Sequence, residues 1–212
     1  MAKWLTPVVI SLLALGLFAG FAKQEPPALA DRRAAGSVSA QDGRLRYDAR
    51  ASPVIALPGG HRAIIHSLLN VPERMHYGEY VWNEAGAPPG AVWIRVDLDS
   101  QLVSVFRSGH EIGSAVILYG DPTKPTPSGA FTVLEKAQDH YSRSYDAPMP
   151  YMLRLTRDGV AIHASAVQRG AATHGCIGVP MAFARKLFAV VHTGDPVFVV
   201  GGKGFSQTLI RG

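Results

Sequence analysis

Alternating hydrophobic and polar positions mark two neighbouring strands in the middle of the chain. Residues 92–97 and 102–107 both alternate with a period of two, and the polar residues between them are typical of a turn. Further short apolar runs, bounded by turn residues, predict strands at 111–118, 130–134, 152–156, 160–163 and 196–200. Many short strands with turn signals between them predict a mainly β fold of the β-sandwich-like kind.

One segment has the period of an amphipathic helix. Within residues 180–191, Phe183 and Leu187 share a face, and Pro180 suits a first turn. We therefore expect one helix there, and at most one more. Residues 61–69, after a Gly-Gly pair, are the candidate for that second, shorter helix.

Residues 138–151 interrupt the strand pattern. They are polar, aromatic and aperiodic. A long segment without a period is often a lid or a binding loop, and otherwise it is a plain surface connection. We expect a loop here and leave these two uses open.

An apolar run precedes all of these elements. Residues 8–22 are apolar apart from Ser11, Lys3 stands before them, and residues 28–30 form a small-x-small site. This order is typical of an export signal, although the run is shorter than the roughly 20 residues that cross a bilayer comfortably. We expect either a cleaved signal peptide or a membrane anchor, and in both cases a protein body in the periplasm or cell envelope.

Composition divides the remaining chain. Residues 23–52 are rich in Ala, Arg, Gly, Ser and Pro and have no sustained apolar period, which is typical of a linker. We therefore expect a signal peptide or anchor at 1–30, a linker and small N-terminal extension at 31–91, a folded β domain at 92–201 and a C-terminal tail at 202–212.

The overall composition is that of a globular protein with an apolar segment added. Of the 212 residues, 47% are hydrophobic and 17% are charged, which excludes a mostly disordered chain. A net charge of +5 suits nucleic acid, anionic lipid or an anionic polymer. The basic residues are scattered, however, and the densest group, Arg44, Arg46 and Arg50, is loose. We therefore expect no nucleic-acid partner.

The chain contains a single cysteine, Cys176. In an exported protein, a lone thiol is either a small buried residue or a group kept for its chemistry. Cys176 follows Thr173, His174 and Gly175, and His163 lies upstream. An imidazole can take the thiol proton and return it to a leaving amine, while main-chain N–H groups beside a glycine can stabilise an oxyanion. Spacing alone does not choose between the two histidines as the base.

Two other interpretations use the same residues. His163, His174 and Cys176 could be three ligands of a zinc ion, which would then need a fourth ligand or a water molecule. Cys176 could also be purely structural. The spacing leaves both alternatives open.

Four motifs follow one another between residues 92 and 201. The strand pair over 94–106 is followed by the segment TPSGAF at 126–131. The third motif consists of the pair Ile162-His163 and the run THGC at 173–176, and the segment GDPV at 194–197 is the fourth. In this order the motifs resemble the L,D-transpeptidase catalytic domain family (YkuD-like).

The resemblance implies a β-sandwich-like fold and acyl transfer through cysteine. Cys176 would attack the carbonyl of a peptidoglycan stem tetrapeptide, release the terminal D-alanine, and pass the acyl group to an amine of another stem as a 3–3 crosslink, or to another amine. The resemblance gives the proton-transfer role to His163 and implies no metal and no cofactor. It suggests supporting or oxyanion roles for Thr173, His174, Gly175 and Ser165. The residues expected to bind substrate are Tyr119, Thr126, Tyr141 and Tyr145.

Two positions depart from the family pattern. Ala164 stands after His163 where glycine or serine is usual, and Gly178 stands two positions after Cys176 where arginine or asparagine is usual. The missing side chain at position 178 leaves the acceptor open. A thiol-dependent hydrolase on the same scaffold, either an L,D-carboxypeptidase or an amidase, is therefore an alternative, and so is a non-catalytic wall-binding module. The expected partners are peptidoglycan stem peptides and, through the N-terminal segment, the inner membrane.

Overall fold

The computed structural model describes residues 38–201. The predicted signal peptide or anchor at 1–30 and the predicted tail at 202–212 therefore lie outside the described residues. Within the described range, no helix is both long and apolar enough to cross a membrane.

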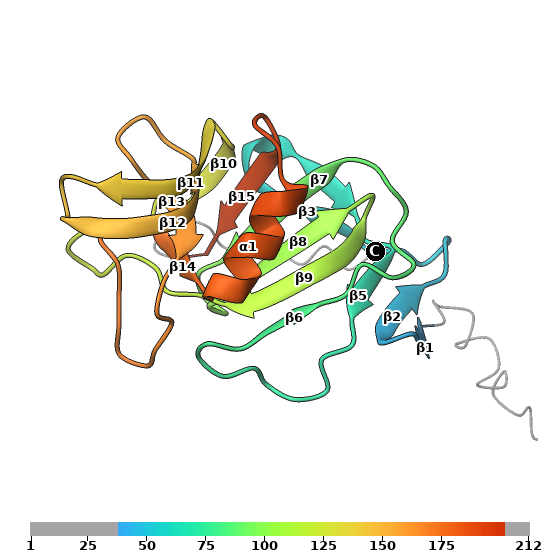
Figure 1. Cartoon of the computed structure of the whole chain (residues 1–212). Coiled ribbons are helices and arrows are strands. Elements are labelled where there is room, and N and C mark those ends of the chain that lie inside the picture. Colours follow the sequence, from blue (N-terminus) through green and yellow to red (C-terminus); the bar gives the residue numbers. More distant parts are fainter. Residues whose placement is uncertain (1–37, 202–212) are drawn as a thin grey trace, which may run out of the picture. The chain divides into compact units, whose positions relative to one another are not determined.

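Most strands belong to one nine-stranded sheet (Figure 1). Its strands are β1 Val38–Gln41, β2 Arg44–Tyr47, β5 Ser67–Leu69, β6 Tyr80–Trp82, β7 Val92–Asp97, β8 Leu102–Arg107, β9 His110–Val116, β10 Gly129–Thr132 and β15 Pro196–Val200. They are ordered β1-β2-β5-β9-β8-β7-β15-β10, and β6 pairs separately with β9. The predicted strands 92–97, 102–107 and 196–200 are confirmed with the same bounds.

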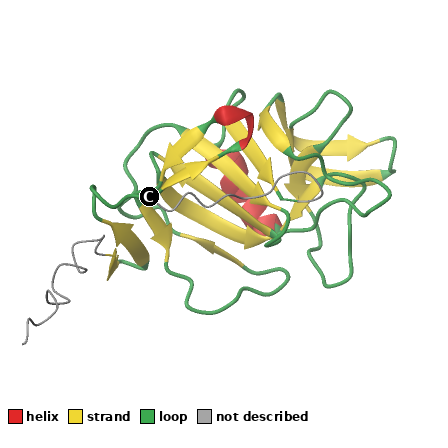
Figure 2. Ribbon diagram, turned by 180° about the vertical axis from the view of Figure 1, so that it is seen from behind, coloured by secondary structure: helices red, strands yellow, loops and turns green. Residues whose placement is uncertain are grey.

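A second sheet includes the strands next to His163 and Cys176. It consists of β11 Glu135–Ser142, β12 Ala147–Arg154, β13 Ala161–Ala164 and β14 Ile177–Val179. The pair β13–β14 is parallel, and the other pairs are antiparallel. Helix α1, Met181–Val190, follows β14 directly and packs on β12, β13 and β9. Figure 2 shows how little helix the described chain contains besides α1 and the short 3-10 turn η2, Pro58–Gly60.

One hydrophobic core joins both sheets and the helix. Its fully buried residues come from the nine-stranded sheet, the four-stranded sheet and α1, and they include Ile94, Val96, Val103, Ile112, Leu153, Ile162, Ile177, Phe183 and Leu187. Phe183 and Leu187 point into this core, as the helical period predicts. Because two sheets share a single core, the mainly β, sandwich-like fold class is confirmed.

Two sequence-based expectations for the N-terminal part are wrong. The predicted linker is strand from residue 38 onwards, since β2 pairs with β1 on one side and with β5 on the other. The predicted helix at 61–69 instead forms β4, Arg62–Ile64, which pairs with β3, Val54–Ala56, and then β5. Segments this short take the backbone geometry that their neighbours in the sheet impose, and local propensity does not decide it.

The loop expected at 138–151 is also wrong, because these residues form the antiparallel hairpin β11–β12. The ladder runs from the pair Glu135–Arg154 to the pair Ser142–Ala147. Most side chains of β11 are exposed or half-buried on both faces, so the strand has no alternation that a sequence could display. Only the turn between the two strands is loop.

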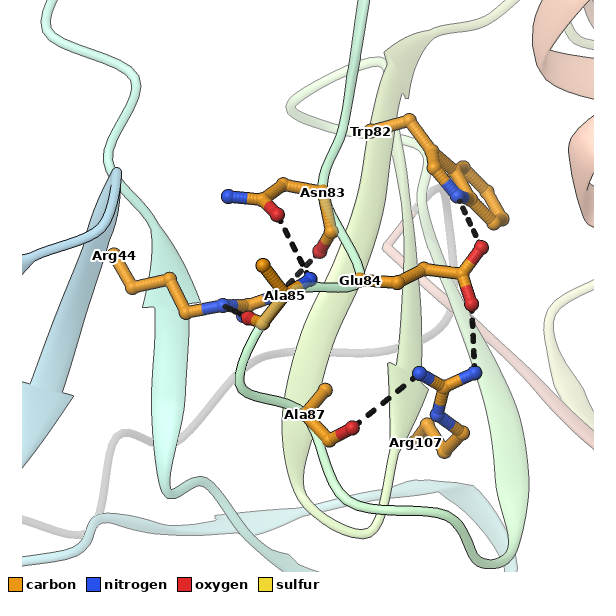
Figure 3. Close-up of polar contacts among 7 residues, drawn as sticks. All are labelled: Arg44, Trp82, Asn83, Glu84, Ala85, Ala87 and Arg107. Atoms are coloured by element: carbon orange, nitrogen blue, oxygen red, sulfur yellow. Dashed lines mark hydrogen bonds and ion pairs between the residues drawn. The ribbon is translucent and has the colours of Figure 1, made fainter.

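A buried guanidinium fastens the N-terminal strands to the rest of the domain (Figure 3). The Arg44 side chain is 0% exposed. It donates to the carbonyl of Ala85 at 2.8 Å, to the carbonyl of Glu111 at 2.5 Å, to the carbonyl of Asn83, and to the Ser67 hydroxyl at 3.3 Å. One side chain thereby connects β2, β5, β9 and the segment after β6.

The segment after β6 is also held by Glu84. Figure 3 shows Glu84 between Trp82 and Arg107. The Glu84 carboxylate accepts from Trp82 Nε1 at 2.9 Å and from Arg107 Nη1 at 2.8 Å. The Trp82 ring also stands edge-on to Phe183 of α1, with 5.4 Å between ring centroids. The extension before residue 91 therefore packs as part of the same body as the later strands.

Candidate active site

Cys176 stands immediately before β14 and beside β13. The parallel register of these strands pairs His163 with Gly178. Since alternate residues of a strand share a face, Cys176 and His163 project from the same face of the four-stranded sheet. On that face Cys176 packs with Met152 and Ala161. The fold thus brings together the two residues that the motifs single out, although they are thirteen positions apart.

Two hydroxyl groups fix the chain around the thiol. Thr126 Oγ1 accepts from the Gly120 N–H at 2.9 Å and donates to the Gly175 carbonyl at 3.0 Å. Thr173 Oγ1 donates to the Cys176 carbonyl at 2.5 Å. Gly175 has a φ of 104°, a backbone conformation that residues other than glycine rarely adopt. Both threonines therefore hold the bend that presents the cysteine, and the Thr126 hydroxyl, expected to bind substrate, is engaged within the protein.

His163 is buried, with 9% of its surface exposed. Its Nδ1 lies 2.9 Å from the carbonyl oxygen of Ala164. A carbonyl oxygen can only accept, so Nδ1 carries the proton and Nε2 of the neutral ring keeps its lone pair. Burial lowers the pKa of His163, the bond to Ala164 raises it, and the charge of His140 lowers it. At neutral pH, His163 is therefore an uncharged base.

The Cys176 thiol is half-buried, and its sulfur lies 3.7 Å from the carbonyl oxygen of Gly159. Burial raises the pKa of the thiol, while the Ala161 N–H and the charge of Lys124 lower it. No hydrogen bond joins Cys176 to His163 among residues 38–201. The raised pKa of the thiol and the lowered pKa of the imidazole both favour the uncharged forms in the resting state.

Alkylation of Cys176 should follow the pH profile of a buried thiol. Because its pKa is raised, the thiolate fraction is small at neutral pH and grows as the pH rises. We expect the rate of reaction with iodoacetamide, followed by mass spectrometry, to climb about tenfold per unit between about pH 7 and pH 9. Cys176→Ala is the unlabelled control. A rate that is already constant below pH 7 would indicate a preformed thiolate–imidazolium pair instead.

A second group of side chains lies next to the thiol on the exposed side of the bend. The ring of His174 stacks on Tyr145, with centroids 4.9 Å apart and planes at 12°. Lys124 Nζ donates to the Tyr145 hydroxyl and lies 4.8 Å from the centre of its ring. Tyr145 comes from the β11–β12 turn, and Lys124 comes from the proline-rich loop before β10. Sequence reasoning selected His174 and Tyr145 but not Lys124, since nothing in a proline-rich loop signals which residue faces the site.

The other predicted residues lie elsewhere or act through their main chain. The half-buried Tyr119 packs against the main core, and its carbonyl accepts from the Thr173 N–H at 3.0 Å. Tyr141 is exposed and donates to Asp146 Oδ1 at 2.7 Å, within the hairpin. The Ser165 N–H donates to the Val179 carbonyl at 2.8 Å. Of the three predicted tyrosines, Tyr145 reaches the segment that carries Cys176 through its ring, and Tyr119 reaches it through its main-chain carbonyl.

The zinc interpretation has no support in the geometry. Within residues 38–201, no three side chains of histidine, cysteine, aspartate or glutamate gather closely enough to hold a metal ion. His163 points its Nδ1 at a carbonyl and His174 stacks on a tyrosine, so the proposed ligand set is not assembled.

Gly178 has no room for a side chain. A Cβ atom there would lie 2.8 Å from the Cβ of Ser165 and 3.4 Å from the Cβ of Leu118. The backbone cannot move away easily, because the N–H and the carbonyl of Gly178 are both bonded to Leu118 at 2.9 Å. The arginine or asparagine that is usual in the family is therefore incompatible with Ser165 in this chain.

Gly178→Asn should destabilise the fold through this contact. We expect a loss of about 1–3 kcal/mol in the free energy of unfolding, measured in urea, because the new Cβ overlaps a fixed atom. Adding Ser165→Gly should recover most of that loss, whereas Ser165→Gly alone should cost about 0.5–1 kcal/mol. Equal stability of Gly178→Asn and the wild type would contradict the packing described.

Comparisons with known proteins agree with this arrangement. Residues 91–199 match the family model of the L,D-transpeptidase catalytic domain, YkuD. L,D-transpeptidase 1 of Mycobacterium tuberculosis is 30% identical over 121 residues, which are 49% of this chain and 48% of that protein. The chain thus spans about half the length of the curated relatives it matches.

Solved structures give the same picture of the fold. The crystal structure of an L,D-transpeptidase from Stackebrandtia nassauensis superposes with a TM-score of 0.50 at 23% identity, covering 57% of this chain and 62% of that one. At this identity the likeness concerns the fold alone. From the matched segment, which includes β13, β14 and Cys176, we conclude that this chain belongs to the L,D-transpeptidase catalytic domain family.

Proposed function

We propose that this chain is an exported L,D-transpeptidase that acts on peptidoglycan stem peptides through a cysteine acyl-enzyme. The observation that carries the proposal is the shared face of Cys176 and His163, with the histidine buried and its Nδ1 committed to a carbonyl. That tautomer leaves Nε2 as the proton acceptor, which is the role a thiol nucleophile requires.

In the first step, the sulfur of Cys176 attacks the carbonyl carbon that links the third and fourth residues of a tetrapeptide stem. His163 takes the thiol proton as the sulfur–carbon bond forms. The carbon–nitrogen bond then breaks, and His163 returns the proton to the leaving amine, which departs as the terminal D-alanine. A thioester of the stem remains on Cys176.

In the second step, an amine of another stem attacks the thioester carbon. His163 takes a proton from that amine, the carbon–sulfur bond breaks, and the thiol is restored by the same proton. The product is a 3–3 crosslink. An uncharged histidine suits both steps, because it begins each one as a base.

Main-chain N–H groups are available for the negative oxygen that forms in each step. In the described part of the chain, no acceptor takes the N–H of Gly175 or of Cys176. The two groups adjoin the attacking sulfur, in a bend that Thr126 and Thr173 hold from either side. Fixed donors of this kind stabilise a tetrahedral oxyanion without moving during the reaction.

The compartment is part of the proposal. Peptidoglycan lies outside the cytoplasm, and the N-terminal order of a lysine, an apolar run and a small-x-small site supports export to the periplasm or cell envelope. N-terminal sequencing of the protein from whole cells tests this part: an intact Met1 in a cytoplasmic fraction would contradict export.

The reaction is tested with defined substrates. Disaccharide tetrapeptides are incubated with the protein, and the products are identified by mass spectrometry. We expect loss of one D-alanine together with crosslinked dimers. If no product forms under conditions in which another L,D-transpeptidase turns over the same substrate, the proposal is overturned.

A second candidate follows from Gly178. Ser165 fills the space beside Gly178, so the arginine or asparagine that is usual there is not available to contact an acceptor, and water or a different amine could replace the second stem. The same assay separates the two functions. Tripeptide monomers without dimers would identify a hydrolase, whereas dimers identify the transpeptidase.

A further inference from the structure

Lys124 is the one cation whose charge acts on the Cys176 thiol in the described chain. Its side chain runs past the bend before the cysteine, since its Cγ lies 3.9 Å from the position that a Cβ of Gly175 would take. The backbone of Lys124 lines the same bend, with its carbonyl oxygen 3.7 Å from that position. The exposed Lys124 side chain therefore starts beside the bend that carries the nucleophile.

Tyr145 holds the Lys124 ammonium group in place, and the His174 ring supports Tyr145. Lys124 Nζ is bonded to the Tyr145 hydroxyl and lies over the Tyr145 ring, which in turn stacks on His174. An exposed lysine is ordinarily mobile, and the hydrogen bond and the cation–π contact restrict it. Only one of its three N–H donors is used by Tyr145, so two remain for a ligand.

The surroundings leave the charge of Lys124 available. The bond to Tyr145 raises the pKa of Lys124, and the charges of Asp158 and of the Cys176 thiolate raise it further. Asp158 forms no ion pair with Lys124 within 4 Å. No cation can project from position 178, where a side chain would strike Ser165. The positive group whose charge acts on the thiol therefore comes from the loop before β10.

We propose that Lys124 is a specificity-determining residue whose ammonium group binds the carboxylate of the amino acid released from the acyl donor. When the scissile carbonyl is against the sulfur, the nearest negative group of a tetrapeptide is the carboxylate just beyond the scissile amide. Lys124 is the cation placed to meet it. Tyr145 and His174 are positioning residues, since they act by holding the lysine.

This inference rests on the proposed function and predicts a preference for a free C-terminal carboxylate. A stem tetrapeptide and the same peptide with a C-terminal carboxamide are compared as donors. We expect the wild type to favour the carboxylate by about 10–100-fold in kcat/KM, because a charge-assisted hydrogen bond is lost in the amide. The loss should appear mainly in KM, as expected for a contact that substrate and transition state share.

The variants separate recognition from thiol activation. Lys124→Met should lower kcat/KM for the carboxylate by about 10–100-fold and leave the amide within about threefold, while Lys124→Arg keeps most of the preference. Lys186→Met, which removes the same charge from α1, should behave as the wild type. Tyr145→Phe should give an intermediate loss. Each peptide should also slow the alkylation of Cys176 by iodoacetamide when it is bound. The degree of this protection compares the two peptides by binding alone, without turnover.

The outcomes distinguish the carboxylate proposal for Lys124 from the proposed transpeptidase function. An equal loss for both donors in Lys124→Met would mean that the lysine acts on the thiol alone, which overturns the carboxylate proposal and leaves the transpeptidase standing. A wild type that does not distinguish the two donors would overturn it as well. A wild type inactive on both donors, and unprotected by either, would overturn the proposed function and the inference with it.

Discussion

Cys176→Ala should abolish turnover of stem tetrapeptides, with a loss of at least about a thousandfold relative to the wild type. Without the sulfur no thioester forms, and no other described side chain beside His163 is a nucleophile of comparable strength. The thermal midpoint should change little, because alanine fills most of the space of a half-buried thiol. Product formation by mass spectrometry and the unfolding midpoint are measured on the same preparation.

The two histidines provide the matched comparison. His163→Asn should lower turnover by about a hundredfold to ten-thousandfold, because the proton acceptor is lost. His174→Asn should cost only about tenfold, since His174 stacks on Tyr145 and does not face the buried side of the thiol. If wall binding persists in Cys176→Ala while the wild type itself releases no D-alanine, the chain is a binding module and not an enzyme. If His174→Asn is the more damaging variant, the roles of the two histidines are reversed.

Arg44→Met should be the most destabilising single change outside the hydrophobic core. It removes the donor shared by the carbonyls of Asn83, Ala85 and Glu111, of which the Glu111 carbonyl belongs to a buried residue, and it leaves a space at a fully buried position. Burial raises the pKa of Glu111, and the charge of Arg44 is among the influences that lower it. The variant therefore also removes a charge that stabilises the ionised Glu111 carboxylate. We expect a loss of about 3–5 kcal/mol in the free energy of unfolding, measured in urea.

Arg50→Met is the control for this variant. Arg50 is an exposed arginine of the same N-terminal segment, and its replacement should change the free energy of unfolding by no more than about 0.5 kcal/mol. Activity should fall with the folded fraction in Arg44→Met and should recover at lower temperature. A variant Arg44→Met that is as stable as Arg50→Met would show that the N-terminal strands contribute nothing to the fold.

Strands with one buried and one exposed face could be predicted from the sequence. Strands whose two faces are similarly exposed could not. Residues 92–97 and 102–107 alternate because they stand in the middle of the sheet, with one face on the core. Strand β11 has no buried side chain and β12 reaches the core only through part of its length, so the hairpin carries no regular alternation. The strand at 44–47 was concealed in another way: it is held by hydrogen bonds of Arg44 and by its neighbours, and arginine in a polar segment is typical of a linker.

For the site, the motifs identified the residues that share a local signature. His163 and Cys176 belong to short runs that can be recognised one at a time, and the parallel pairing of β13 and β14 joins them. Lys124 could not be found in this way, since its place beside the thiol depends on a loop and a hairpin turn that are distant in sequence. The clash between positions 165 and 178 likewise needs the strand register, which no spacing contains.

The place of β15 in the sheet has a consequence for when the surroundings of Cys176 become complete. β15 is the last strand of the described chain, yet it lies between β7 and β10, and within that chain β10 is bonded to no other strand. The loop that carries Lys124 and Thr126 leads directly into β10, so the end of the loop that joins β10 is fixed in the sheet only after residues 196–200 have inserted. Because pairing between segments so distant in sequence closes slowly, a partly synthesised chain would already contain the thiol without its complete surroundings.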